Sequence, residues 1–172
     1  MSTAAFVVAT VGLLVAALSL GWQVASWALS GRRVKVVLLH GVQGRGGFAT
    51  GPVGRNSAPR RIDSMRSQGW DGPEVLAIEV INVGRVTVTI RSYSVIAIGS
   101  GMSYTPIGNA IGKALPFRLE PGESETWYSD VQDAHALVRS VREIGKSATH
   151  VNMSVGLGTK EDRKTRHSIR IN

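Results

Sequence analysis

Hydrophobic residues fill most of the first thirty positions of the chain, and a different pattern follows them. Residues 4–29 contain four polar side chains and no charged one. As an α-helix this segment is about 39 Å long, which exceeds the roughly 30 Å hydrocarbon core of a bilayer. A small domain cannot bury such a helix on all sides, so a soluble core helix is the weaker interpretation. The pattern therefore predicts a transmembrane helix at residues 4–29.

The two ends of this helix differ in charge, and the difference predicts its orientation. Trp22 and Trp27 lie near the C-terminal end, where indole rings favour the headgroup region, and Arg32, Arg33 and Lys35 follow. The positive-inside rule then places the N-terminus outside and the rest of the chain in the cytoplasm, at the cell (inner) membrane. A cleaved signal peptide is the alternative, but it requires a charged N-terminal region and a shorter apolar stretch.

Small residues recur along the predicted helix at multiples of four. They are Ala5, Ala9, Ala17, Gly21 and Ala25. A stripe of small residues lets two helices approach closely, so formation of a homo-oligomer through the helix is one option. The other is that these residues reflect the ordinary composition of membrane helices.

After residue 33 the hydrophobic period changes to two, which is typical of β-strands. Strands are predicted at 34–40, 74–83, 85–98, 124–128, 149–157 and 166–171. Asn82 and Gly84 separate the second and third of these and predict a tight antiparallel hairpin. In the third strand one face is expected in the core and the other in water. The expected core face holds Val86, Val88 and Ile90, and the expected solvent face holds Thr87, Thr89 and Arg91.

Local signals predict a turn and one short helix in the second half of the chain. In residues 120–123, Pro121 and Gly122 occupy the central positions that a type II turn requires. Asp130 is placed to cap a helix that ends at Gly145, with apolar residues along one face. Trp70, Trp127 and Tyr128 are aromatic candidates for a ligand platform, although Trp127 is expected in the core.

Six or seven strands joined by turns, with one connecting helix, predict a two-sheet antiparallel β-sandwich. The segments Val80-Ile81-Asn82-Val83-Gly84-Arg85 and Leu119-Glu120-Pro121-Gly122-Glu123-Ser124, the latter leading into Trp127, carry a resemblance. They resemble the immunoglobulin-like sandwich of uncharacterised bacterial, especially actinobacterial, membrane-anchored proteins. The resemblance covers about 34–172 and implies a fold without an activity. The chain lacks the cysteine pair of antibody-type domains.

The predicted organisation is therefore a transmembrane helix at 4–29, a basic juxtamembrane linker at 30–33 and a mainly β domain at 34–172. Within the domain, residues 44–70 form a Gly-rich basic insert, expected to be a loop. Its cations are Arg45, Arg55, Arg60, Arg61 and Arg66, against the single acid Asp63. Close to a bilayer such arginines can bind anionic lipid headgroups, although a solvated connector explains them equally well. Nucleic-acid binding is not predicted, because no stacking aromatics are interleaved with them.

Composition excludes several kinds of chemistry. The formal net charge is +8, and all charged side chains lie at or after Arg32. Because the chain has no cysteine, disulfides, thiolate zinc sites and cysteine nucleophiles are excluded. The sequence contains no complete phosphate-binding loop, dinucleotide fingerprint or nucleophile elbow. His40, His135, His150 and His167 are scattered without metal-ligand spacing.

These observations predict a non-enzymatic interaction module held at the lipid bilayer, with an unidentified protein partner and no cofactor or metal. Two alternatives stay open. One is a membrane-tethered enzyme whose site is assembled from distant residues, such as a histidine and the acidic turn around Glu120 and Glu123. The other is an anionic-lipid-binding module that acts through the basic insert.

Overall fold

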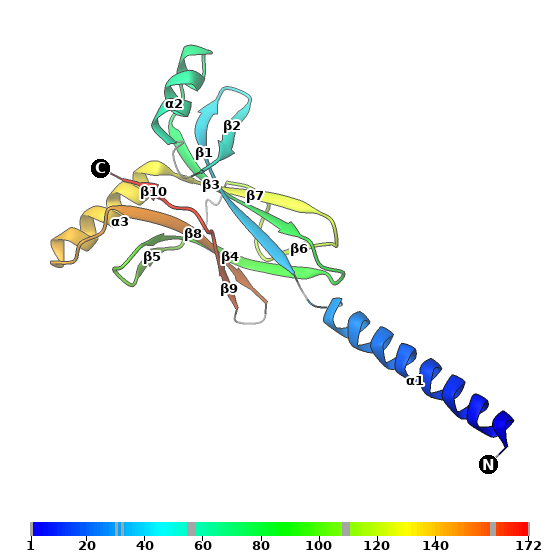
Figure 1. Cartoon of the computed structure of the whole chain (residues 1–172). Coiled ribbons are helices and arrows are strands. Elements are labelled where there is room, and N and C mark those ends of the chain that lie inside the picture. Colours follow the sequence, from blue (N-terminus) through cyan, green and yellow to red (C-terminus); the bar gives the residue numbers. More distant parts are fainter. Residues whose placement is uncertain are drawn as a thin grey trace.

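An N-terminal helix projects away from a two-sheet β-domain (Figure 1). The computed structural model describes residues 2–29, 31, 33–54, 58–107, 111–158 and 161–171. Within these ranges, residues 27–29 and 58–61 are described by their backbone alone. Helix α1 (Thr3–Leu29) confirms the helix predicted at 4–29. Its segment Thr3–Ser26 is long and apolar enough to cross a membrane, and none of it is buried against the domain.

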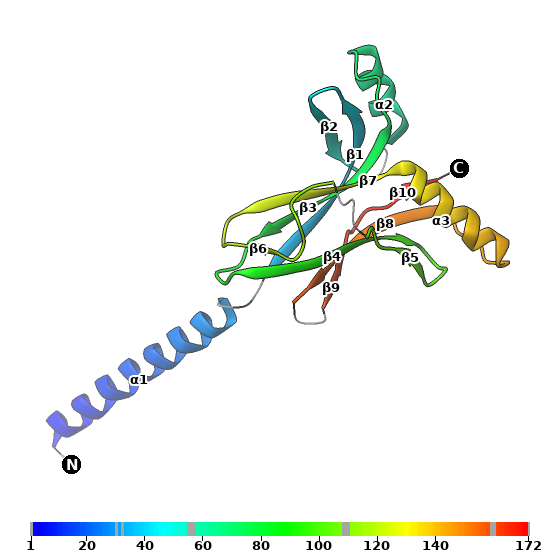
Figure 2. The same ribbon diagram turned by 180° about the vertical axis from the view of Figure 1, so that it is seen from behind.

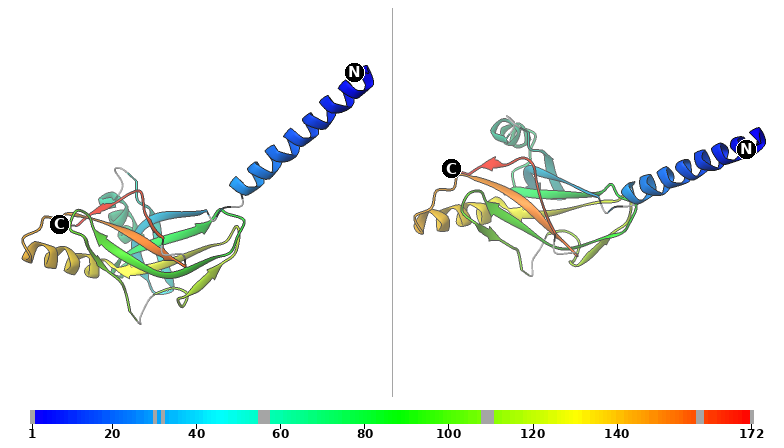
Figure 3. Two further views of the ribbon diagram at one scale, coloured as in Figure 1. Left: turned by 90° about the horizontal axis from the view of Figure 1, so that it is seen from below. Right: turned by 60° about the horizontal axis from the view of Figure 1, so that its bottom comes forward.

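Two antiparallel sheets form the domain, which confirms the predicted mainly β sandwich (Figures 2 and 3). The first sheet has the order β2-β1-β3-β7 and contains β1 (Val34–Gly44), β2 (Gly47–Pro52), β3 (Glu74–Asn82) and β7 (Ser124–Asp130). The second has the order β10-β8-β4-β5 and contains β4 (Val88–Ala97), β5 (Met102–Tyr104), β8 (His150–Leu157) and β10 (Ile169–Arg170). Two short strands complete it: β6 (Phe117–Leu119) pairs with β4, and β9 (Asp162–Lys164) pairs with β8.

The strand order follows the immunoglobulin arrangement. Strands β1, β3 and β7 take the places of A, B and E in one sheet. Strands β10, β8, β4 and β5 take the places of G, F, C and C′ in the other. Without a disulfide between the sheets, the centre of the core is filled by large side chains instead, among them Trp127 and Tyr93.

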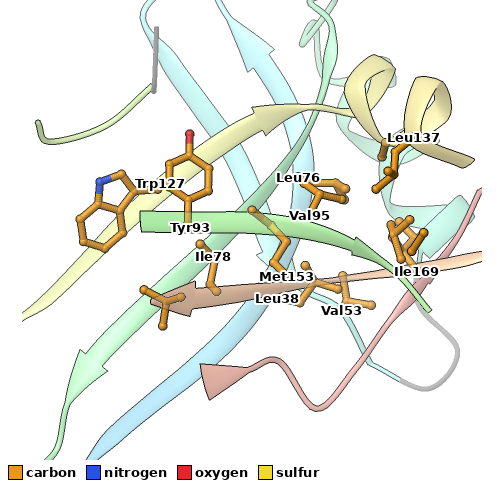
Figure 4. Packing of buried hydrophobic residues seen from close by; sticks show 14 of the residues in the cluster. Leu38, Val53, Leu76, Ile78, Tyr93, Val95, Trp127, Leu137, Met153 and Ile169 are labelled. Atoms are coloured by element: carbon orange, nitrogen blue, oxygen red, sulfur yellow. The ribbon is translucent and has the colours of Figure 1, made fainter. Parts of the chain in front are cut away.

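The core lies between the facing sheets (Figure 4). Leu38 and Ile78 from the first sheet and Val95 and Met153 from the second are at most 2% exposed. Trp127 is fully buried, as predicted. Because side chains on a strand alternate between faces, alternate residues of a strand enter this layer, except where β4 shifts register between Ile90 and Ser92.

Two local predictions are confirmed. Helix α3 (Val131–Glu143) begins after Asp130, whose carboxylate accepts a hydrogen bond from the Gln132 amide at 2.8 Å, and Gly145 follows it with φ of 74°. At residues 120–123 the Glu123 amide donates to the Glu120 carbonyl at 3.1 Å, and Gly122 has φ of 83°. Both features depend on residues within a few positions of one another, which explains why the sequence predicts them.

The predicted hairpin between β3 and β4 is wrong, because the two strands belong to different sheets. The Asn82 side chain holds the connection that crosses between them. Its amide nitrogen donates to the carbonyls of Val86 and Leu119, both at 2.9 Å, and its oxygen accepts from the Gly84 amide at 3.0 Å. An Asn-x-Gly sequence predicts a change of chain direction, but it does not specify whether the chain returns to the same sheet.

The predicted register of the third strand is partly wrong. Val86 lies in the crossing connection and is 40% exposed, whereas Val88 and Ile90 are buried as predicted. The register with β8 then shifts between Ile90 and Ser92. A shift of one residue exchanges the two faces of a strand, so Tyr93 points into the core.

The insert at 44–70 is not the loop that the sequence predicts, because it contains β2 and helix α2 (Ala58–Ser67). The domain therefore has two helices rather than one. β2 carries no alternating pattern of apolar and polar residues. It forms by pairing with β1, which continues to Gly44, four residues past the predicted end of that strand at His40. The strands approach closely at Gly41, where an added Cβ would lie 1.9 Å from the Ala49 carbonyl oxygen. Ile62 is the buried residue that anchors α2.

Tyr93 makes the stability of the domain sensitive to alkaline pH. Its hydroxyl donates to the Tyr128 carbonyl at 2.7 Å. Burial, with a smaller contribution from Tyr104 and Asp133, raises the pKa of Tyr93 to about 12. A raised pKa means that the fold favours the protonated phenol, so this stabilisation is complete below about pH 10 and is lost as the pH rises towards 12.

We expect the unfolding free energy of the full chain in detergent to fall as the pH rises from about 10 to about 12, and to fall less steeply in Tyr93→Phe. At pH 7 the variant should lose about 1 kcal/mol, since the Tyr128 carbonyl loses its donor. Denaturant titration at a series of pH values measures both effects. An equally steep alkaline decline in the variant would exclude Tyr93 as its source.

Candidate functional site

The turn between β1 and β2 lies at the end of the first sheet that is farthest from α1 (Figure 1). A groove opens at this end. Residues 43–48, around the turn between β1 and β2, form one wall, and residues 68–73, leading into β3, form the other. The groove has a volume of about 1060 Å³. We call it the distal groove, because β1, at about 3.4 Å per residue, separates it from the end of α1 by roughly 34 Å.

Glycines allow the two walls of the distal groove to pack against each other. The ring of half-buried Trp70 lies on Gly44, where an added Cβ would approach ring atom Cε3 to 2.5 Å. At Gly72 an added Cβ would lie 1.9 Å from the Gln43 carbonyl oxygen. Next to it, the Gln43 amide donates to the Pro73 carbonyl at 2.9 Å. The loop that carries Trp70 is therefore held against β1 by close contacts. A residue with a side chain at position 44 or 72 would prevent them.

The distal groove combines aromatic surface with planar polar side chains. Trp70 and Phe48 line it, and the Phe48 ring also stacks on Tyr128 with centroids 4.0 Å apart. Arg45 and Asp71 are exposed beside them, one on each wall. Such a site can hold a ligand by ring contacts and directional hydrogen bonds. Among the described residues that line it there is no pair of nucleophile and base.

Next to the groove, a row of ionisable side chains joins three elements. Arg66 of α2 contacts Glu74 of β3 at 2.9 Å, and the other Glu74 oxygen lies 3.5 Å from Nε2 of His40 on β1. The Arg66 side chain is 54% exposed, so its ion pair contributes at most about 1 kcal/mol. The row holds α2 in position beside the sheet, and it supports the groove rather than lining it.

His40 and the acidic turn, one of the pairings that the sequence leaves open for an enzyme site, lie at opposite ends of β3. His40 is opposite Leu76 in the pairing of β1 with β3, whereas the acidic turn at 120–123 precedes Ser124, which is opposite Ile81 at the other end of β3. The carboxylate near His40 belongs to Glu74 instead. Within the described part of the chain, no three His, Asp or Glu side chains are grouped so that they can hold a metal ion.

The predicted membrane-interface residues lie where the chain enters the domain. Trp22 is 75% exposed on α1, and Arg33 and Lys35 are exposed at the start of β1. Arg32 lies outside the described residues, as does the side chain of Trp27. These positions agree with a helix whose C-terminal end meets a basic juxtamembrane segment.

Two of the candidate lipid-contact arginines lie at the end of the domain away from α1. Arg45 lies at the turn between β1 and β2, and Arg66 lies in the last turn of α2, both at the distal end. Arg55 lies outside the described residues, and Arg60 and Arg61 are described by their backbone alone. This placement does not support contact between Arg45 or Arg66 and the bilayer that would hold α1.

Sequence reasoning named Trp70 as a candidate aromatic but missed the groove around it. The opposite wall comes from residues 43–48, more than twenty positions earlier in the chain, and closes only when β1 and β2 pair. The glycines at 44 and 72 were the available signal, since isolated glycines beside a strand mark close backbone approach. No protein-family model and no curated protein sequence matches this chain.

Proposed function

We propose that the chain is a single-pass membrane protein whose sandwich is a non-enzymatic binding module that presents the distal groove to a partner protein. One observation carries the proposal. The chain joins a fully exposed apolar helix, Thr3–Ser26, to a folded domain whose large groove lies at the opposite end from that helix. An apolar helix of this length is long enough to cross a bilayer, and the groove lies about 34 Å along β1 from the end of the helix nearest the domain.

The charge pattern supports a cytoplasmic position for the groove. The flank before α1 contains no lysine or arginine, whereas Arg33 and Lys35 follow α1 and are exposed. Cationic residues next to a membrane helix are retained on the cytoplasmic side. The proposed location is the inner membrane, with the N-terminus outside.

Cysteine labelling tests this orientation, because the native chain contains no cysteine. Ser2→Cys and Ser147→Cys are both exposed positions, one before α1 and one beyond α3. In intact cells a membrane-impermeant maleimide should label the first variant and label the second only after permeabilisation. Labelling of Ser147→Cys in intact cells, with Ser2→Cys protected, would reverse the orientation.

Site-specific crosslinking tests the binding function of the distal groove. A photoreactive residue in place of Gln68, which lines the groove, should form a discrete adduct in native membranes. The adduct should be lost when Gly44→Val is added, because the new side chain displaces the Trp70 ring. The same photoreactive residue at Ser147 is the matched control. Identical adducts from both positions would show that the groove is not the site of binding.

A further inference from the structure

The connection between β3 and β4 exposes apolar side chains where a soluble domain normally carries polar ones. Val83 is 55% exposed and Val86 is 40% exposed. Outside α1, six large apolar residues of the described chain are exposed, and two of them lie within residues 83–86. The sequence pattern predicts that Val86 belongs to the core, and the structure places it at the surface instead.

This connection is attached to the segment that leaves α1. The Val83 amide donates to the Arg33 carbonyl at 2.9 Å. A Cβ added at Gly84 would lie 2.7 Å from the Arg33 nitrogen and 3.0 Å from the Gly31 carbonyl oxygen, so the two stretches of backbone are in close contact. Arg33 lies four positions after Leu29, a distance of at most about 14 Å. The connection therefore stays close to the end of the helix, whatever the angle between helix and domain.

The charges around the connection are those that favour an anionic surface. Arg33, Lys35 and Arg85 are exposed there. Two exposed acids of the turn at 120–123 lie nearby, where Glu120 accepts a hydrogen bond from the Thr87 hydroxyl at 2.6 Å and Glu123 accepts one from the Glu120 amide at 3.0 Å. The three cations outnumber these two carboxylates. Apolar side chains flanked by cations are the composition of segments that bind at the headgroup boundary of a bilayer.

We infer that residues 83–86 dock the sandwich onto the bilayer. Val83 and Val86 enter the boundary between headgroups and acyl chains, and Arg85 and Arg33 lie against anionic lipid phosphates. The inference rests on the proposed membrane span of α1 and adds a second contact to it. With two contacts the domain has a defined orientation, which holds the distal groove away from the membrane surface.

The test uses the full chain with single cysteines at three positions, each carrying the same environment-sensitive fluorophore. The variants are Val86→Cys in the connection, Leu14→Cys in α1 and Ile144→Cys, an exposed apolar position just beyond α3. Each is reconstituted into phosphatidylcholine vesicles that contain phosphatidylglycerol. We expect blue-shifted emission and quenching by spin-labelled lipid at positions 14 and 86, and neither at position 144. Ile144→Cys controls for insertion driven by the fluorophore itself.

Two further substitutions separate the electrostatic part of the contact from the apolar part. Arg85→Glu should reduce the quenching at position 86 in these vesicles, and Val83→Ser should reduce it even in neutral ones. If position 86 is quenched no more than position 144 while position 14 stays quenched, the docking inference is wrong and the span stands. If position 14 is not quenched, the span is wrong, and the proposed function fails with it.

Discussion

Replacing Val88 with Asp is expected to unfold the sandwich. Val88 is 2% exposed at the start of β4, opposite Leu119 of β6. A carboxylate at this position is buried without a partner, which costs several kcal/mol out of a total stability of about 5–15 kcal/mol for an ordinary domain. Circular dichroism of the full chain in detergent, followed during heating, should show loss of the β signal at much lower temperature than in the parent chain.

Thr89→Asp is the matched control for this variant. Thr89 is the next residue on β4, points away from the core and is opposite Arg118 of β6. A carboxylate there meets a cation across the strands, so the change in unfolding free energy should stay within about 0.5 kcal/mol. Thr87 is a poor control, since its hydroxyl donates to Glu120. Equal destabilisation by Val88→Asp and Thr89→Asp would contradict the observed register.

The features that the sequence predicts correctly are those whose causes lie close together in the chain. Helix α3 is an example, because its capping residue Asp130 and the terminating Gly145 flank a single amphipathic stretch. The turn at 120–123 is another, since Pro121 and Gly122 specify its dihedral angles directly. The same holds for α1, whose length and lack of charge do not depend on any distant residue.

The features that the sequence does not predict depend on contacts between distant residues. Whether the chain returns to its own sheet after Asn82 is decided by Leu119, a residue 37 positions away that accepts a hydrogen bond from the Asn82 side chain. The shift of register after Ile90 requires β8 beside β4. β2 exists because β1 continues to Gly44 and offers it a partner. None of these partners can be identified from a local pattern.

The same limit applies to the two proposed binding surfaces. The distal groove needs residues 43–48 and 68–73 together, and only the fold places Trp70 on Gly44. At the end of the domain next to α1, alternation places Val86 inside, but the structure places it at the surface, where its carbonyl accepts a hydrogen bond from the Asn82 side chain. Both surfaces lie where the chain departs from its simple strand pattern, which is where functional sites commonly occur.

Replacing Trp127 with Ala is expected to cost about 3–5 kcal/mol, the second large effect on stability. Trp127 is fully buried on β7, its ring lies edge-on to Phe117 with centroids 6.0 Å apart, and its Nε1 donates to the Lys113 carbonyl at 2.9 Å. It therefore packs the core and also fixes the segment that connects β5 to β6. An added Cβ at Gly112 would lie 2.9 Å from Cδ1 of the same ring, so this segment is in close contact with the indole.

Comparison with Trp127→Phe separates these two roles. Phenylalanine keeps most of the apolar volume but removes the hydrogen bond to Lys113, so the loss should be about 1–2 kcal/mol, mostly from the unpaired carbonyl. In addition, hydrogen exchange of the amides near Lys113 should be faster in Trp127→Phe than in the parent chain, while exchange in α3 stays unchanged. A Phe variant as unstable as the Ala variant would show that the indole hydrogen bond, rather than its packing, contributes most of the stability. If both variants are as stable as the parent chain, Trp127 does not hold the sheets together.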